Sequence, residues 1–352
     1  TEEPDYSKWS KVEKRDPDTD FKYFKFQNLL KRLDSNLQVS FCFEMYEVKD
    51  AINMLEREIE EGTNKNREGF KFKALEWEAT LLKGYILDKQ YKQAFQQAQK
   101  ILNHQQELQE AIDLKANVFA QVGQIMSEFG KHRSAINYLG NSLKLKKQKF
   151  GEMSHQVALV YHQIAEACEK DKKNVEAINA IAKSLEICYK VSGKQQAQLI
   201  LENYKLLGEI WMQEGKYQES LDIYTKARDF SVKTFGEIHP NVGEQYAKLG
   251  SINLKLAKTE EAAKKFEKSV CIQKKYCGEN SFNLAKLLSE IGVAYEESFL
   301  LEEAENYLSK SLEIYKEDER EDIFSKAGAY LALSNLLCKK GRYNEALENL
   351  LE

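Results

Sequence analysis

The sequence predicts an all-α fold, an α-solenoid of about eight antiparallel helix pairs. Two observations carry this prediction. First, the 352 residues contain only three prolines, Pro4, Pro17 and Pro240, so almost nothing after residue 20 interrupts a helix. Second, a small residue recurs at intervals of 41 to 43 residues along the chain, with small and bulky neighbours at fixed distances from it.

The recurring residue is alanine in seven of its eight positions, and we call it the anchor. The anchors are Ala51, Ala94, Ala135, Ala177, Ser220, Ala262, Ala304 and Ala346. A fixed period of this length indicates a stacked repeat rather than a globular core. We expect each unit to be one helix pair, with the anchor early in the second helix.

Small and bulky side chains around the anchors predict how the two helices of a pair pack. Twelve residues before the anchor the chain places a small residue, at Gly123, Ala165, Gly208, Gly250, Gly292 and Ser334. Four residues after it the chain places a bulky one, at Leu55, Leu139, Ile181, Tyr224, Phe266, Leu308 and Leu350. Seven residues after it stand Ser142, Ser184, Ala227, Ser269 and Ser311. Small residues let the helices approach, and bulky ones fill the remaining space.

Glycines mark the expected turns. Gly130, Gly215 and Gly341 stand between the two helices of a unit, where a helix end needs a left-handed residue. A second set follows the second helix, at Gly151, Gly193, Gly236 and Gly278.

These spacings resemble the tetratricopeptide repeat. The usual unit has about 34 residues, whereas this one has about 42, which would add roughly one turn to each helix. FGEIHPNV between units and GKYQES before a second helix are similar to the repeats of kinesin light chains and nephrocystin-3-like proteins. The resemblance covers about residues 70–352. It implies a right-handed superhelix whose first helices line a concave, protein-binding face.

The domain organisation is expected to have three parts. Residues 1–20 are charged and predict an extended arm, and residues 21–69 predict a degenerate helix pair followed by a loop. Residues 70–352 form the repeat array. Because the sequence ends within a second helix without a polar capping element, we expect the array to continue beyond residue 352.

Composition argues against several classes of partner. The 52 basic and 56 acidic residues give a net charge of −4, so no basic stripe for nucleic acid is expected. No apolar run reaches the roughly 20 residues that cross a bilayer, and no secretory signal opens the chain. We therefore expect a cytoplasmic protein, and the family resemblance implies the cytoskeleton or cilium as a narrower setting. The six cysteines lack a CxxC pair and are expected to be reduced and mostly buried.

Chemical motifs are missing, so we predict no enzyme activity, no cofactor and no metal. The sequence has no phosphate-binding glycine loop, no HExxH and no GxSxG. His155 and His162 are seven residues apart, with only Glu166 and Cys168 spaced to join them, and we expect solvent-facing or capping histidines. His239, which precedes Pro240, is expected in a turn. Carboxylate pairs such as Glu296–Glu297 and the run KLKKQK at 144–149 are expected to be solvated.

The resemblance implies a groove lined by polar residues of the first helices. The candidate partner-binding residues are Asn117, Gln121, Gln124, Gln163, Glu166, Glu202, Lys205, Glu209, Glu244, Lys248, Glu290 and Asn335. They are mixed in sign, so the groove would bind an extended or helical protein segment through hydrogen bonds and salt bridges around a few apolar contacts.

Two groove chemistries of the family are absent. Repeats that bind a C-terminal carboxylate carry a lysine followed four residues later by asparagine, but Lys205 is followed by Glu209. The neighbouring asparagines of kinesin light chains are also replaced, for example by Lys205–Leu206. Neither specificity is therefore carried over.

The leading functional prediction is a non-enzymatic scaffold or adaptor subunit of a larger assembly, in a ciliary, axonemal or other cytoskeletal setting. One alternative is a regulatory receptor that responds to a peptide or ligand. Another is the non-catalytic repeat region of a larger enzyme. All three follow from the array, which indicates how the protein binds and leaves its partner open.

Overall fold

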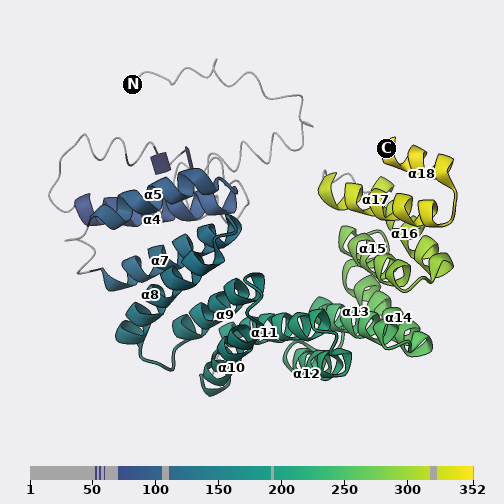
Figure 1. Ribbon diagram of the computed structural model, residues 1–352, viewed down its shortest axis with the longest axis horizontal. Helices are drawn as coiled ribbons and strands as arrows, with labels where there is room; N and C mark the ends of the chain where they lie inside the picture. Colours follow the sequence, from purple (N-terminus) through teal and green to yellow (C-terminus); the bar gives the residue numbers. More distant parts are fainter. Residues whose placement is uncertain are drawn as a thin grey trace, which may run out of the picture. The chain divides into compact units, whose positions relative to one another are not determined.

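The computed structural model describes residues 52–53, 55–56, 59, 70–104, 111–191, 194–317 and 323–351. These residues confirm the all-α prediction: they form paired helices joined by short turns, with no strand among them (Figure 1). Three expectations fall outside the described residues. They are the arm at 1–20, most of the helix pair and loop at 21–69, and the turn at Gly193.

The chain divides into two compact units, residues 1–149 and 150–352, which we describe separately. The first unit holds α4 (Phe70–Leu87), α5 (Tyr91–Asn103), α7 (Ile112–Glu128) and nearly all of α8 (His132–Phe150). The second unit holds α9 (His155–Lys170), α10 (Asn174–Lys190), α11 (Lys194–Gln213), α12 (Tyr217–Phe235), α13 (Pro240–Lys255), α14 (Thr259–Cys277), α15 (Phe282–Glu297), α16 (Leu301–Glu317), α17 (Ile323–Lys339) and α18 (Tyr343–Leu351). Within the second unit, each second helix also contacts the first helix of the next pair.

The small residue twelve positions before the anchor brings the two helices of a pair into close contact. At Gly292 an added Cβ would lie 2.7 Å from Cγ of Leu308, and the same distance separates the corresponding position of Gly123 from Leu139. The bulky residue four positions after the anchor therefore fills the space that the glycine leaves. Small and bulky residues at this spacing determine which faces of the helices meet.

Serines seven positions after the anchor do more than save space. Each donates its hydroxyl to a carbonyl of the first helix 26 residues earlier: Ser142 to Ala116 (2.7 Å), Ser184 to Ala158 (2.9 Å), Ser269 to Gly243 (2.7 Å) and Ser311 to Ala285 (2.6 Å). Ala227 cannot make this bond. In its repeat the anchor Ser220 donates to the carbonyl of Gly208 instead, at 2.9 Å.

A left-handed residue ends the first helix of all seven described pairs. Gly130, Gly215 and Gly341 adopt it as predicted, with φ of 71°, 73° and 78°. The other four pairs use residues that the glycine pattern missed, namely Lys89, Lys172, Ala257 and Phe299, with φ of 58° to 60°. The turn geometry is thus common to all pairs even where the sequence lacks glycine, because the backbone hydrogen bonds of the helix end are the same.

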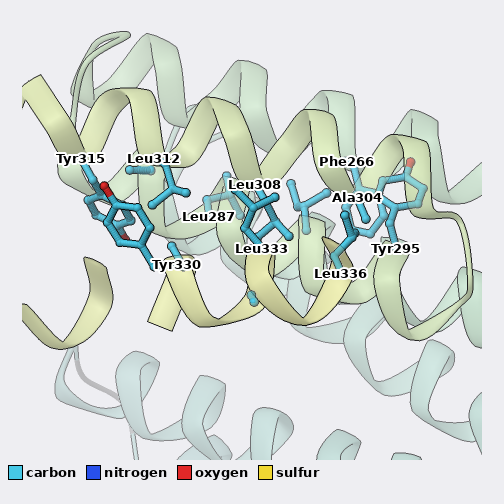
Figure 2. Close-up of a cluster of buried hydrophobic side chains, with 14 of the residues drawn as sticks. Phe266, Leu287, Tyr295, Ala304, Leu308, Leu312, Tyr315, Tyr330, Leu333 and Leu336 are labelled. Carbon is cyan, nitrogen blue, oxygen red and sulfur yellow. The ribbon is translucent and has the colours of Figure 1, made fainter. Parts of the chain in front are cut away.

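The core runs between the helix layers. Figure 2 shows one of its clusters, in which side chains of α14, α15, α16 and α17 interlock. Phe266 and Leu308 are fully buried, and Tyr295 packs on Phe266 with ring centroids 5.2 Å apart. Aromatic pairs at such separations add to the stabilisation that comes from burial alone.

Three sequence expectations are wrong. Lys146 is buried rather than solvated, because it lies one helical turn after the buried Ser142 and so shares its face. Leu350 is exposed, since it lies in the last described turn of α18. Cys271 and Cys338 are also exposed, while Cys168 and Cys188 are buried.

Candidate partner-binding surface

Two pockets lie on the first helices of the second unit. One, of about 430 Å³, lies between α9 and α11, and we call it the acidic pocket. Its lining carries three carboxylates and one lysine: it consists of Leu159, His162, Gln163, Glu166, Glu202, Lys205, Leu206 and Glu209. The larger pocket, of about 470 Å³, is lined mainly by α13 and α15, and we call it the lysine pocket. Its charged residues are Lys248, Lys255, Lys286, Glu290 and Glu297.

His162 forms the floor of the acidic pocket and is only 7% exposed. Its Nδ1 lies 3.1 Å from Oδ1 of the fully buried Asn203. Its Nε2 lies 3.6 Å from Glu166 Oε1 and 4.0 Å from Glu202 Oε2, which are ion-pair distances only if the ring is protonated. The expectation of solvent-facing histidines is therefore wrong for His162.

Ion pairs connect successive first helices along this surface. Lys205 of α11 reaches Glu244 of α13 at 3.3 Å, and Lys255 of α13 reaches Glu297 of α15 at 2.8 Å. Burial alone would lower the pKa of Lys205, but the carboxylates of Glu244, Glu209 and Glu290 outweigh it and raise the pKa. Lys205 therefore stays charged and is drawn toward α13.

The expectation that Glu296 is a solvated charge is also wrong. Glu296 is 8% exposed and pairs with Lys339 of α17 at 2.8 Å. Its neighbour Glu297 is exposed and takes part in the surface ion pair with Lys255. Adjacent helical residues face directions about 100° apart, so a sequence pair need not share an environment.

Comparison with known proteins bears on the family. The profile of the family described as Tetratricopeptide repeat matches residues 246–317, which run from α13 to the end of α16. The glycine contacts and serine hydrogen bonds seen in that stretch recur in pairs that precede it, and the left-handed turns recur on both sides of it. Residues 246–317 are therefore similar to the tetratricopeptide repeat.

Solved structures of low identity share the fold of this chain. The apo form of the quorum sensor NprR from B. thuringiensis has 16% identity and a TM-score of 0.61, covering 94% of this chain and 91% of its own. The apo form of RapI has 17% identity and a TM-score of 0.57, and the match covers 81% of this chain and 98% of RapI. BtubC (BKLC) from P. vanneervenii has 16% identity and a TM-score of 0.50, and the match covers 61% of this chain and 86% of BtubC. No curated protein matches the sequence.

The structure brings together seven of the twelve candidate residues of the repeat surface. The acidic pocket contains Gln163, Glu166, Glu202, Lys205 and Glu209, and the lysine pocket contains Lys248 and Glu290. Glu244 pairs with Lys205, and Asn335 is exposed on α17. Asn117, Gln121 and Gln124 lie on α7 of the first unit, where Asn117 and Gln124 are exposed.

Sequence reasoning missed several residues of this repeat surface. The lysine pocket is also lined by Lys255, Lys286 and Ser289. Beside the acidic pocket, Asn203 forms a hydrogen bond with His162. The two lysines could have been predicted from the sequence, since Lys255 and Lys286 lie on first helices, as the candidate Lys248 does. Asn203 could not be found by spacing, because its partners come from two different helices.

Metal binding and membrane insertion receive no support from the described part of this repeat protein. In that part no cluster of three or more His, Cys, Asp or Glu side chains could hold a metal ion, and His155 instead bonds Gln196 at 2.9 Å. None of the described helices is both long enough and apolar enough to cross a membrane.

Proposed function

We propose that this repeat protein binds an extended or helical segment of a partner protein along the first helices α9, α11, α13 and α15. The observation that supports the proposal is the pair of pockets of opposite charge on this surface. Carboxylates outnumber lysines three to one in the acidic pocket, and lysines outnumber carboxylates three to two in the lysine pocket. Charge complementarity of this kind sets the direction in which a segment binds.

Apolar contacts are also available to the segment. Leu159 and Leu206 line the acidic pocket, and Met212 and Val293 line the lysine pocket. A segment that reached both pockets would bury these side chains between its charged ends. Such a combination of a few apolar contacts with flanking polar groups is typical of peptide recognition in grooves.

A display library of random peptides, selected on the whole chain, tests the proposal. The photoreactive residue benzoylphenylalanine is placed at Ser289, in the lysine pocket, and in a matched variant at Lys233, which is exposed on α12. Selected peptides are expected to crosslink to the first position and not to the second. Equal crosslinking at both positions, or selection of no peptide at all, would contradict a first-helix binding surface.

A role as scaffold or adaptor of a larger assembly is the wider form of this proposal. The array offers binding positions on successive repeats, which suits a subunit that holds other chains together. A ciliary or cytoskeletal setting stays a prediction from the family resemblance, as does the alternative of a ligand-responsive receptor. The receptor alternative predicts that a bound peptide compacts the chain in small-angle scattering, whereas a scaffold keeps its dimensions.

A further inference from the structure

The hydrogen bonds beneath the acidic pocket determine where His162 carries its proton. Ser184 donates its single hydroxyl hydrogen to the carbonyl of Ala158 at 2.9 Å, so it must accept from Asn203, whose Nδ2 lies 2.9 Å away. The other Nδ2 hydrogen goes to the carbonyl of Leu199 at 2.8 Å. The amide oxygen of Asn203 therefore faces His162, and Nδ1 of His162 must donate to it.

The opposite ring nitrogen is left as an acceptor at the pocket. With the proton on Nδ1, Nε2 of neutral His162 carries a lone pair. The carboxylate oxygens of Glu166 and Glu202 near it, at 3.6 Å and 4.0 Å, are acceptors too and lie beyond hydrogen-bond distance. The side chain of His162 is only 8% exposed, so little water is available to relieve this arrangement.

Other groups of the pocket also provide hydrogen-bond acceptors without a matching donor. Oε1 of Gln163 is buried without a hydrogen-bond partner, and Glu209 adds a third carboxylate. The one lysine of the lining, Lys205, bonds Glu244 on the next first helix. The pocket therefore gathers acceptors and negative charge, and the one cationic donor of its lining already bonds Glu244.

The shape of the pocket favours a side chain over an inorganic ion. Among the described residues no cluster suits a metal ion. Leu159 and Leu206 line the same cavity of about 430 Å³ and can cover the methylene groups that carry an ammonium or guanidinium. Both cations donate several hydrogen bonds at once and can serve a ring nitrogen and two carboxylates together.

We propose that the acidic pocket receives one lysine or arginine side chain of the bound segment, through Nε2 of His162 and the carboxylates of Glu166 and Glu202. This inference rests on the proposed function, since it names the chemistry of one residue of the segment. The partner is thus a segment with a basic residue that enters between α9 and α11.

Peptides selected on the chain from a random display library test the proposal directly. Each binding peptide is resynthesised with citrulline in place of arginine or norleucine in place of lysine, and binding is measured by titration calorimetry. The chain is used as wild type, as Glu166→Gln with Glu202→Gln, and as Glu176→Gln, an exposed carboxylate of α10 outside the pocket. Unchanged unfolding temperatures establish that the variants fold alike.

Loss of the cationic charge of the peptide, or of the two carboxylate charges of the pocket, is expected to weaken binding roughly tenfold. Loss of both together should weaken it no further. Glu176→Gln should bind like the wild type. Peptides that bind at the first helices with equal affinity to wild type and to Glu166→Gln with Glu202→Gln would overturn the inference and leave the proposed function standing. If no peptide binds the first helices, the proposed function and this inference both fall.

Discussion

A Cβ atom added to Gly250 would lie 2.5 Å from Cε1 of Phe266, too close to the ring that fills the space between α13 and α14. Real Cβ atoms do not approach so closely, and the fully buried Phe266 also packs against Tyr295, with ring centroids 5.2 Å apart. The relationship recurs in other pairs with leucine in place of phenylalanine, as in Gly292 and Leu308. It is therefore a feature of the repeat.

Gly250→Ala is expected to destabilise the second unit although alanine favours helix. The gain in helix propensity is about 1 kcal/mol, whereas overpacking of a filled core costs about 1–3 kcal/mol, and the ring cannot shift away. We expect a net loss of up to about 2 kcal/mol in the free energy of unfolding, measured by urea denaturation.

The chain supplies its own control for this variant. In one pair the same two positions hold Ala165 and Ile181, and both are buried. Adding Phe266→Ile to Gly250→Ala copies that pair and should recover part of the lost stability. A double variant that is less stable than both single variants would show that the Gly250–Phe266 contact is not the cause.

Ala257→Gly is expected to stabilise the turn between α13 and α14. Ala257 has φ of 59° and its N–H bonds the carbonyl of Leu254, while Lys258 bonds Asn253, which is the Schellman arrangement. A left-handed conformation costs a non-glycine residue about 1–2 kcal/mol, and the added freedom of the unfolded glycine chain costs about 0.4–1 kcal/mol.

The expected net gain is therefore about 0.5–1 kcal/mol, seen as a higher urea midpoint with an unchanged slope. Gly215→Ala, at the same position of an earlier pair, should lose a similar amount. If the two changes had the same sign, backbone conformation would not be the controlling factor.

The contrast between these turns shows how far the sequence could predict the fold. The anchors and the small and bulky positions determine the pairing, because they reflect close packing that few residues satisfy. Turns at Ala257 and Phe299 carry no sequence signal, since hydrogen bonds hold them against the preference of the residue. The same limit applies to the acidic pocket: Glu166 and Glu202 were expected on the surface, but the support of His162 by Asn203 depends on tertiary contacts.

Lys146→Met is expected to stabilise the first unit. Lys146 is 5% exposed, and burial lowers its pKa despite the opposing charge of Asp113. Because the unfolded chain binds a proton more readily, stability of the wild type rises with pH as it passes from the lowered pKa toward the ordinary value of 10.5.

Methionine has a similar length and no charge to desolvate, so we expect a gain of about 1 kcal/mol at neutral pH. The gain should shrink as the pH rises from the lowered folded pKa toward 10.5, because the folded lysine has then lost the charge that burial disfavours. Lys144→Met, at an exposed position of the same helix, should change stability little. A gain that stays constant up to pH 10.5 would rule out lysine desolvation as its source.

Asn203→Leu is expected to lower stability and to leave the imidazole of His162 without a single preferred tautomer. Asn203 is fully buried and bonds His162, Ser184 and Leu199, so the change leaves an N–H of the imidazole without an acceptor. An unsatisfied buried polar group costs about 1–3 kcal/mol. In nitrogen NMR spectra the wild-type ring should show the proton on Nδ1, and the variant should show a mixture. A wild-type ring protonated on Nε2 alone would contradict the assigned hydrogen bonds.

Glu305→Gln is expected to weaken the contact of α16 with the turn between α17 and α18. The carboxylate accepts from Lys340 and from Arg342, both at 2.6 Å, while Lys340 also reaches Glu302 and Arg342 also reaches Glu345. Burial alone would raise the pKa of Glu305, but the hydrogen bonds from Lys340 and Arg342 outweigh it and hold the pKa below its usual value of 4.5. A connected network of this kind contributes more than an isolated surface pair.

At neutral pH we expect the substitution to cost about 1 kcal/mol. Since the folded pKa of Glu305 is lowered, its contribution is complete above the ordinary value of 4.5 and is lost as the pH falls through the lowered value. The difference in free energy of unfolding between wild type and Glu305→Gln, measured by urea titration at several pH values, should therefore narrow below pH 4.5. Glu313→Gln, an exposed carboxylate of the same helix, provides the matched control and should show no such narrowing. A cost for Glu305→Gln that is independent of pH would mean that the amide disturbs packing and that the charge network contributes nothing.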